Sequence, residues 1–146
     1  MTFITWDTHG FKAKVNEAMH LQFIQAFDAE WAQQYPAVDD FERKMGYALD
    51  NQKLYHAAKV LACPMKKNPP NWQHGRVLYA LARNYLKGQI DVSILVIGTA
   101  KGSSALCLLW ALRDTDIIGT VASVDVIDPN ERVRRNTVAE VDGYKT

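Results

Sequence analysis

The sequence has neither a strong excess of positive or negative charge nor a long apolar run, and each absence excludes a class of protein. Seventeen basic and sixteen acidic residues leave a formal net charge of +1, so no overall field favours nucleic acid or an anionic membrane. The longest apolar stretch considered, Ala105–Leu112, is far shorter than the roughly 18 residues that a membrane span needs. We therefore expect neither a membrane nor a nucleic acid as the partner.

Cysteines and histidines are also few, and none is spaced as a metal site would require. Cys63 and Cys107 form neither a CxxC pair nor a metal-binding pattern. The histidines, none of which pairs at ligand spacing on one helix, are His9, His20, His56 and His74. The opening MTFITWDTHG lacks the basic start and apolar middle of a signal peptide. We expect reduced thiols, a cytoplasmic location and no bound metal.

The first 88 residues have helical periodicity. Apolar residues recur every four positions over residues 11–35, up to Tyr35-Pro36. Asp39 or Asp40 is expected to cap a second helix that Pro64 stops. Asn71 is expected to cap a third, which ends at Gly88. The predicted inner faces are Phe41, Met45, Leu49, Leu54, Ala58 and Leu61 on the second helix, and Leu78, Leu81, Ala82 and Tyr85 on the third.

The pattern changes after Gly88 to strand, helix and strand. Val92–Ile97 and Gly119–Ile127 are short and rich in β-branched residues, as parallel strands buried on both faces are. The helix between them, residues 103–113, is apolar almost all round, so we expect it to lie between layers. The predicted fold is α/β: a helical region over residues 1–88, then the first βαβ unit of a Rossmann-like sheet over residues 89–146.

Two parallel strands do not make a stable sheet, because each keeps an unpaired edge. We expect the edge of residues 94–97 to be covered in one of three ways: by further strands of a longer parent chain, by a partner, or by strand exchange between copies. Self-association through this edge is therefore expected.

The segment SILVIGTAKGSSALCLLWAL contains a glycine-rich turn where the first strand meets its helix. A Walker loop is excluded, because three residues rather than four separate Gly98 from Gly102 and Lys101 precedes Gly102. The dinucleotide pattern GxGxxG fits poorly, with Ala100 and Ser103 at two of its positions. Asp125, 23 residues past Gly102, favours an adenosyl ligand, because its carboxylate could accept hydrogen bonds from both ribose hydroxyls. A turn with no ligand is the remaining alternative.

These residues carry a family resemblance. LVIGTAKGSSALCLLWAL followed by VASVDVIDP resembles the class I S-adenosylmethionine-dependent methyltransferases, in the subgroup whose first motif contains GTxxGxSAL. QHGRVLYALAR (residues 73–83) and DGYKT (residues 142–146) also resemble segments of that subgroup. The resemblance implies S-adenosylmethionine as the cofactor. The positions that it assigns to cofactor binding are Gly98, Thr99, Ala100, Gly102, Ser103 and Asp125.

The sequence departs from the family pattern at two points. The acid expected two residues before the first glycine, which helps to orient the methionine end of the cofactor, is Val96 here. The family core has seven strands, whereas this chain ends soon after the second, so we expect a truncated chain. The catalytic residues are not identified by the resemblance, and the activity of this chain alone is left open.

The predicted function is methyl transfer from S-adenosylmethionine to a small-molecule acceptor. The alternatives are a non-catalytic module for assembly or partner binding and an NAD-type nucleotide-binding protein. Trp72 or His74 is a candidate for lining the cofactor pocket, Cys107 is expected in the core, and Asp128 is expected to cap a turn or helix. The basic cluster of residues 131–135 is expected to be a solvated face.

Overall fold

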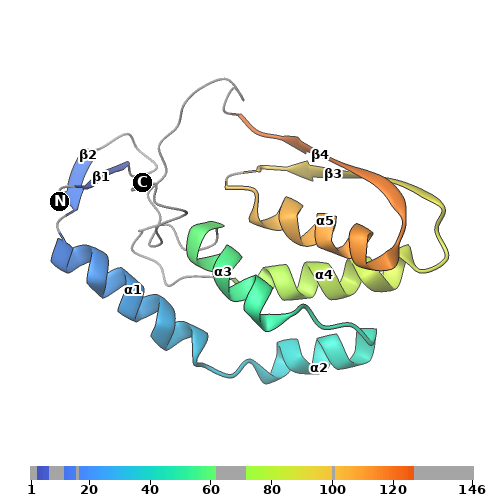
Figure 1. Cartoon of the computed structure of the whole chain (residues 1–146), viewed down its shortest axis with the longest axis horizontal. Coiled ribbons are helices and arrows are strands. Elements are labelled where there is room, and N and C mark those ends of the chain that lie inside the picture. Colours follow the sequence, from blue (N-terminus) through green and yellow to red (C-terminus); the bar gives the residue numbers. More distant parts are fainter. Residues whose placement is uncertain (1–2, 7–11, 16, 62–71, 100, 127–146) are drawn as a thin grey trace.

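The computed structural model describes residues 3–6, 12–15, 17–61, 72–99 and 101–126. Within these ranges the chain is a mixed α/β protein with five helices and a two-stranded parallel sheet (Figure 1). An antiparallel hairpin precedes them. The predictions for Asn71, Asp128 and residues 131–135 lie outside the described residues, as does Ala100. The second predicted strand, Gly119–Ile127, is wrong at its end, because the strand stops at Val124 and the backbone leaves the extended ladder at Asp125.

The hairpin replaces the start of the first predicted helix. Strand β1 (Phe3–Trp6) pairs with β2 (Lys12–Val15), Phe3 lying opposite Val15. Helix α1 then runs over Glu17–Trp31, so the prediction of one helix over residues 11–35 is wrong at both ends. The sequence KAKV alternates polar and apolar residues, which suits a strand, and pairing with β1 satisfies its backbone groups.

The second predicted helix is in fact two helices. α2 (Pro36–Met45) begins at Pro36, which is suited to a first helical turn, rather than at a cap on Asp39 or Asp40. It ends at Gly46, whose φ of +78° favours glycine and whose N–H bonds back to the carbonyls of Glu42 and Arg43. α3 (Asn51–Leu61) starts after Asp50, whose side chain accepts the Lys53 N–H at 2.8 Å.

α4 (Gln73–Leu86) forms as predicted, but its buried face is rotated. Leu81 and Tyr85, predicted to face inward, are 48% and 73% exposed. The residues buried instead are Gly75, Tyr79, Ala80 and Leu86. Gly75 decides the contact, because a Cβ there would lie 2.8 Å from the Cys107 Sγ on the neighbouring helix. The absence of a side chain lets the two helices approach along this row.

The βαβ unit is confirmed. β3 (Asp91–Ile97) and β4 (Ile118–Val124) pair in parallel, from Asp91 opposite Ile118 to Ile97 opposite Val124. α5 (Ser103–Thr115) connects them and packs on β4 and on α4. Figure 1 shows α5 along one side of the two strands, with α4 beyond it and α2 and α3 farther out.

The other face of this sheet is exposed, which corrects the prediction that both strands are buried on both faces. Val92, Ile94 and Val121 pack toward the core beside α5. The alternate positions point outward, where Leu95 is 60% exposed, Ile97 81% and Val124 54%. Leu109 of α5 is also 46% exposed, so α5 is not enclosed between layers in the described part of the chain. The cause is that the described residues place a helix on one side of the strands only.

A single hydrophobic cluster joins the helices to α5. Its members come from residues on both sides of Gly88, and they are Phe27, Leu49, Leu54, Ala58, Trp72, Tyr79, Leu86, Cys107, Ala111 and Leu112. Leu49, Leu54 and Ala58 are thus buried as the helical pattern predicts, and Cys107 is a core residue, 2% exposed. Cys107, Ala111 and Leu112 thus anchor α5, whose N-terminus follows the glycine turn, against the helical part of the chain.

Candidate functional site

The glycine turn lies at the carboxyl edge of the sheet, beside the end of β4. The Gly98 N–H donates to the carbonyl of Val124 at 2.7 Å, so the parallel ladder continues one residue past Ile97. Gly98 has a φ of +80°, a backbone conformation that residues other than glycine rarely adopt. Asp125, half-buried, follows Val124 directly. The hydrogen bond therefore brings the first glycine and the predicted ribose acid to the same edge.

A tight turn leads from this edge into α5. The Gly102 N–H donates to the Thr99 carbonyl at 2.8 Å, and Gly102 has a φ of +82°. The Gly102 carbonyl accepts the Leu106 N–H at 2.9 Å and begins the helix. The N-cap residue, Gly102, has no side chain to cap this helix start. The first N–H groups of α5, from Ser103 onward, have no acceptor within the helix and present partial positive charge at the sheet edge.

Open space adjoins both glycines. A Cβ built at Gly98 or at Gly102 would meet no described atom within 4 Å, in contrast to Gly75 and Gly119, which pack against neighbours. The two glycines of the turn are thus required by backbone conformation and not by close packing among the described residues. A ligand could approach the backbone here without displacing a described side chain.

Val96, at the position where the sequence resemblance leads us to expect an acid, is a core residue. It is 9% exposed and, by strand alternation, points to the same face as Val92 and Ile94, toward α5. Its side chain offers no hydrogen bond to a ligand. Of the residues singled out from the sequence, Gly98, Thr99, Gly102, Ser103 and Asp125 therefore share one edge, and Val96 supplies packing beneath it.

The described titratable groups near this edge do not form a metal site or an activated thiol. No group of three or more His, Cys, Asp or Glu side chains in the described residues could hold a metal ion. Burial raises the pKa of the Cys107 thiol to about 11, so the thiol is protonated at neutral pH. Cys107 lies one turn after Ser103 and packs against Gly75.

Among the described helices, none is long and apolar enough to cross a bilayer.

Trp72, a candidate for lining the cofactor pocket, lies in an aromatic cluster of the helical region instead. It is 4% exposed, and its ring centroid is 4.1 Å from that of Trp31. His74, at the start of α4, is half-buried.

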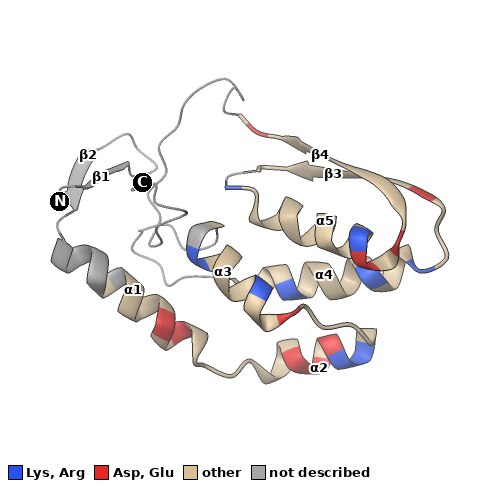
Figure 2. Cartoon of the chain, in the orientation of Figure 1, with Lys and Arg blue, Asp and Glu red and all other residues tan. Residues whose placement is uncertain are grey.

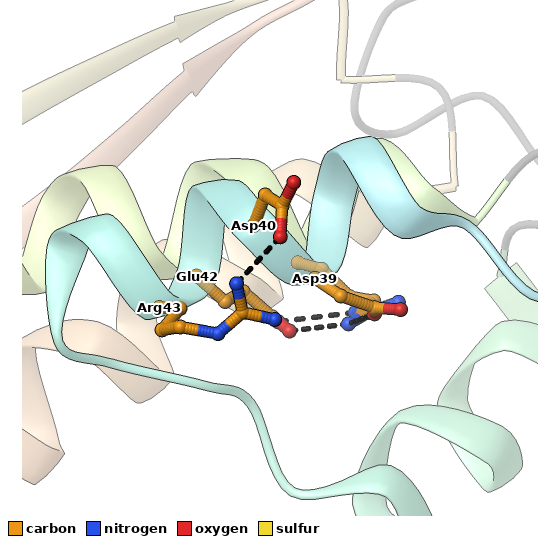
Figure 3. A network of polar contacts seen from close by, with 5 residues as sticks. Asp39, Asp40, Glu42 and Arg43 are labelled. Carbon is orange, nitrogen blue, oxygen red and sulfur yellow. Dashed lines mark hydrogen bonds and ion pairs between the residues drawn. The ribbon is translucent and has the colours of Figure 1, made fainter.

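Sequence reasoning missed a buried polar network on α2 and α4. The Arg76 guanidinium donates to Glu42 at 3.0 Å through Nε and to Asp39 at 2.6 Å through Nη2, and Nη2 bonds the second Glu42 oxygen too. Glu42 is 6% exposed. Figure 3 shows Asp39 and Glu42 on one side of α2 and the separate Asp40–Arg43 pair. The hydrogen bonds to Glu42 raise the pKa of Arg76, despite the opposing effect of burial. A spacing of 34 residues between Arg76 and Glu42 gives no local signal for such a pair.

In comparisons with known proteins, no protein-family model, no curated protein and no solved structure matches the chain.

Proposed function

We propose that the carboxyl edge of β3 and β4 binds the adenosyl group of S-adenosylmethionine, and that the chain is part of a class I methyltransferase acting on a small-molecule acceptor. The observation that carries the proposal is the hydrogen bond from the Gly98 N–H to the Val124 carbonyl, 2.7 Å long, which sets the glycine turn beside Asp125. In this proposal β3–α5–β4 is the first βαβ unit of a Rossmann-like sheet. Ligands of such sheets bind at the carboxyl ends of the strands.

Each residue of the edge has a physical role in this proposal. Gly98 and Gly102 leave the backbone open to a ligand, since no described atom lies within 4 Å of the Cβ position at either. Asp125 accepts hydrogen bonds from the ribose hydroxyls, and the ionised carboxylate makes them stronger than neutral ones. When bound, the cofactor supplies a methyl group on a sulfonium, and the chain contributes alignment. Val96 offers nothing to the methionine end, so we expect binding to depend chiefly on the ribose end.

Isothermal titration of the full chain with S-adenosylhomocysteine tests the proposal. We expect saturable binding that Asp125→Ala weakens at least tenfold, the loss of hydrogen bonds to a charged group worth about 1.5–3 kcal/mol. Asp91→Ala is the matched control, because Asp91 begins β3 at the opposite edge of the sheet and is exposed. Binding of NADH without S-adenosylhomocysteine would favour the dinucleotide alternative. Binding of neither ligand by the wild-type chain would refute both.

The exposed sheet face favours a second candidate function, self-association. Leu95, Ile97 and Val124 together form an apolar outer face, and Figure 2 shows no basic residue along β3 or β4. Lysines at sheet edges commonly prevent strand addition. We propose that a second copy of the chain adds to the edge of β3 that pairs with no described strand, which would extend the sheet and its apolar face.

Light scattering after size-exclusion chromatography tests this second candidate. We expect a dimer whose fraction rises with concentration, and a monomer for Leu95→Lys. Tyr85→Lys is the control, since Tyr85 is 73% exposed on α4, away from the strands. A wild-type chain that stays monomeric at all concentrations, or equal dimerisation of the two variants, would contradict the assignment.

A further inference from the structure

The outer face of β3 and β4, on the side away from α5, is a surface of its own beside the glycine edge. Figure 1 shows the described helices on the other side of these strands. By strand alternation the outward side chains form cross-strand rows, which are Asp91–Ile118, Ser93–Thr120, Leu95–Ala122 and Ile97–Val124. The two rows nearest the carboxyl edge are apolar, and the Leu95 and Ile97 side chains there are largely exposed.

The inner face of the same two strands shows what covers a surface of this size. A single helix, α5, packs there, and it lies so close to β4 that a Cβ at Gly119 would be 2.9 Å from the Leu112 Cδ2. Two strands are about 10 Å wide, and the seven residues of each are about 23 Å long. These are the dimensions of one helix of about 15 residues. The outer face therefore has room for one helix, whereas a second sheet would overhang it.

The charge of the outer face disfavours a second copy of this chain as its cover. Among the outward positions of β3 and β4, Asp91 alone is charged. If two copies packed face to face with parallel strands, their Asp91 side chains would meet. With antiparallel strands, each Asp91 would lie against the apolar row of Ile97 and Val124. Both arrangements take a carboxylate out of water without a partner, which is costly, whereas a different chain can place a basic residue over Asp91.

We propose that the outer face of β3 and β4 docks one amphipathic helix of a partner protein. The apolar stripe of this helix covers the rows of Leu95 and Ile97, and a basic residue of the helix pairs with Asp91. This surface is independent of the adenosyl proposal, because it uses side chains on the face of the sheet, whereas the adenosyl group would bind the backbone and Asp125 at its carboxyl edge. It also differs from strand addition to β3, which uses backbone groups.

Two synthetic 15-residue peptides of equal composition test the proposal. One carries leucines at helical spacing (i, i+3, i+4, i+7) and lysines in its last turn, and the other carries the same leucines at alternate positions, as a strand does. The readout is the methyl signals of the ¹³C-labelled chain. We expect the helical peptide to shift the Leu95, Ile97 and Val124 signals saturably, at concentrations where the alternating peptide shifts them little. Equal or tighter binding of the alternating peptide, or no saturable shift with the helical one, would overturn the proposal.

Two leucine variants locate the bound peptide. Leu95→Ser removes an apolar side chain from the outer face, and we expect it to weaken binding of the helical peptide about tenfold. Leu109→Ser is the matched control, because Leu109 is also exposed but lies on α5, on the other side of the strands, so we expect unchanged affinity. Equal affinities of the two variants would contradict docking on the outer face.

Asp91→Asn tests the charged end of the surface. We expect the helical peptide to bind about twofold to fivefold more weakly to this variant at low salt, and the difference to disappear at high salt, because an exposed ion pair is weak and is screened. An affinity equal to that of the wild-type chain at low salt would contradict the proposed pairing with Asp91.

Discussion

The helical region and the carboxyl edge of the sheet differ in how far their residues are buried and paired. In the helical region Phe27 is fully buried, Leu54 is 2% exposed and Arg76 is held by two carboxylates. At the sheet edge, a Cβ at Gly98 or Gly102 would meet no described atom within 4 Å, and Ile97 is 81% exposed. Among the described residues, the helical region is therefore held by internal contacts that these edge residues lack. Substitutions in the two regions should differ accordingly.

The largest effect is expected in the aromatic cluster. Phe27 contacts the rings of Trp31 and Tyr55, at centroid distances of 5.8 and 5.6 Å. Phe27→Ala removes a fully buried ring and leaves a cavity, which should lower the free energy of unfolding by about 3–5 kcal/mol. Ile97→Ala on the outer face should change it by less than about 0.5 kcal/mol. Urea denaturation of both variants measures the difference, and equal losses would remove the distinction between the regions.

The next largest effect concerns the polar network of α2 and α4. Arg76→Met leaves the Glu42 carboxylate buried without its partner, so we expect a loss of about 2 kcal/mol of stability. Arg43→Met breaks the exposed pair with Asp40 and should cost less than about 1 kcal/mol. Thermal melts of the two variants compare a buried ion pair between α2 and α4 with an exposed pair within α2. Similar melting temperatures would show that burial does not strengthen the Arg76 interaction.

Two glycines allow a sharper comparison between packing and backbone conformation. Gly75→Ala places a Cβ 2.8 Å from the Cys107 Sγ, so either this thiol or the spacing of α4 and α5 must shift, at a cost of about 1–3 kcal/mol. Gly98→Ala meets no described atom and costs only the strain of a positive φ, about 1 kcal/mol. The double variant Gly75→Ala with Cys107→Ala should recover part of the first loss. If it recovers none, the Gly75–Cys107 contact does not set the helix spacing.

A smaller effect is expected from the Cys107 thiol as pH rises. Its pKa in the folded chain is about 11, above the ordinary thiol value of 9.0, so the unfolded chain loses this proton first. The stabilisation is complete below the unfolded pKa and is lost as the pH rises through the folded value. We therefore expect stability to fall between pH 9 and 11, and to fall less in Cys107→Ala. An identical pH dependence in both chains would assign the loss to other groups.

The sequence predicts the βαβ unit better than the surrounding structure. Continuous β-branched runs and a glycine turn are local signals, so β3, α5 and β4 follow from residues close together in the chain. The break at Gly46 also has a local cause, but an apolar pattern that continued on both sides obscured it. The hairpin β1–β2 depends on pairing between two segments, and the rotation of α4 depends on a glycine opposite Cys107. Such tertiary contacts leave no periodic trace in one sequence.

The same distinction between local signals and tertiary contacts applies to the candidate site. The sequence places Gly98 and Asp125 correctly after strand ends and Gly102 at the start of α5, and the parallel register then brings Gly98 beside Val124 and Asp125. It does not predict that Val96 packs inward while the outer face of the sheet stays exposed, because burial depends on which layers surround the strands. It also gives no indication of the ion pair between Arg76 and Glu42, which lie 34 residues apart.

The most direct test of the central proposal is an amide NMR spectrum of the ¹⁵N-labelled chain during titration with S-adenosylhomocysteine. The proposal predicts saturable shifts of the Gly98, Gly102 and Asp125 amides, with the indole signals of Trp31 and Trp72 unchanged. Unshifted glycine amides at saturating ligand, or shifts confined to the helical region, would contradict it.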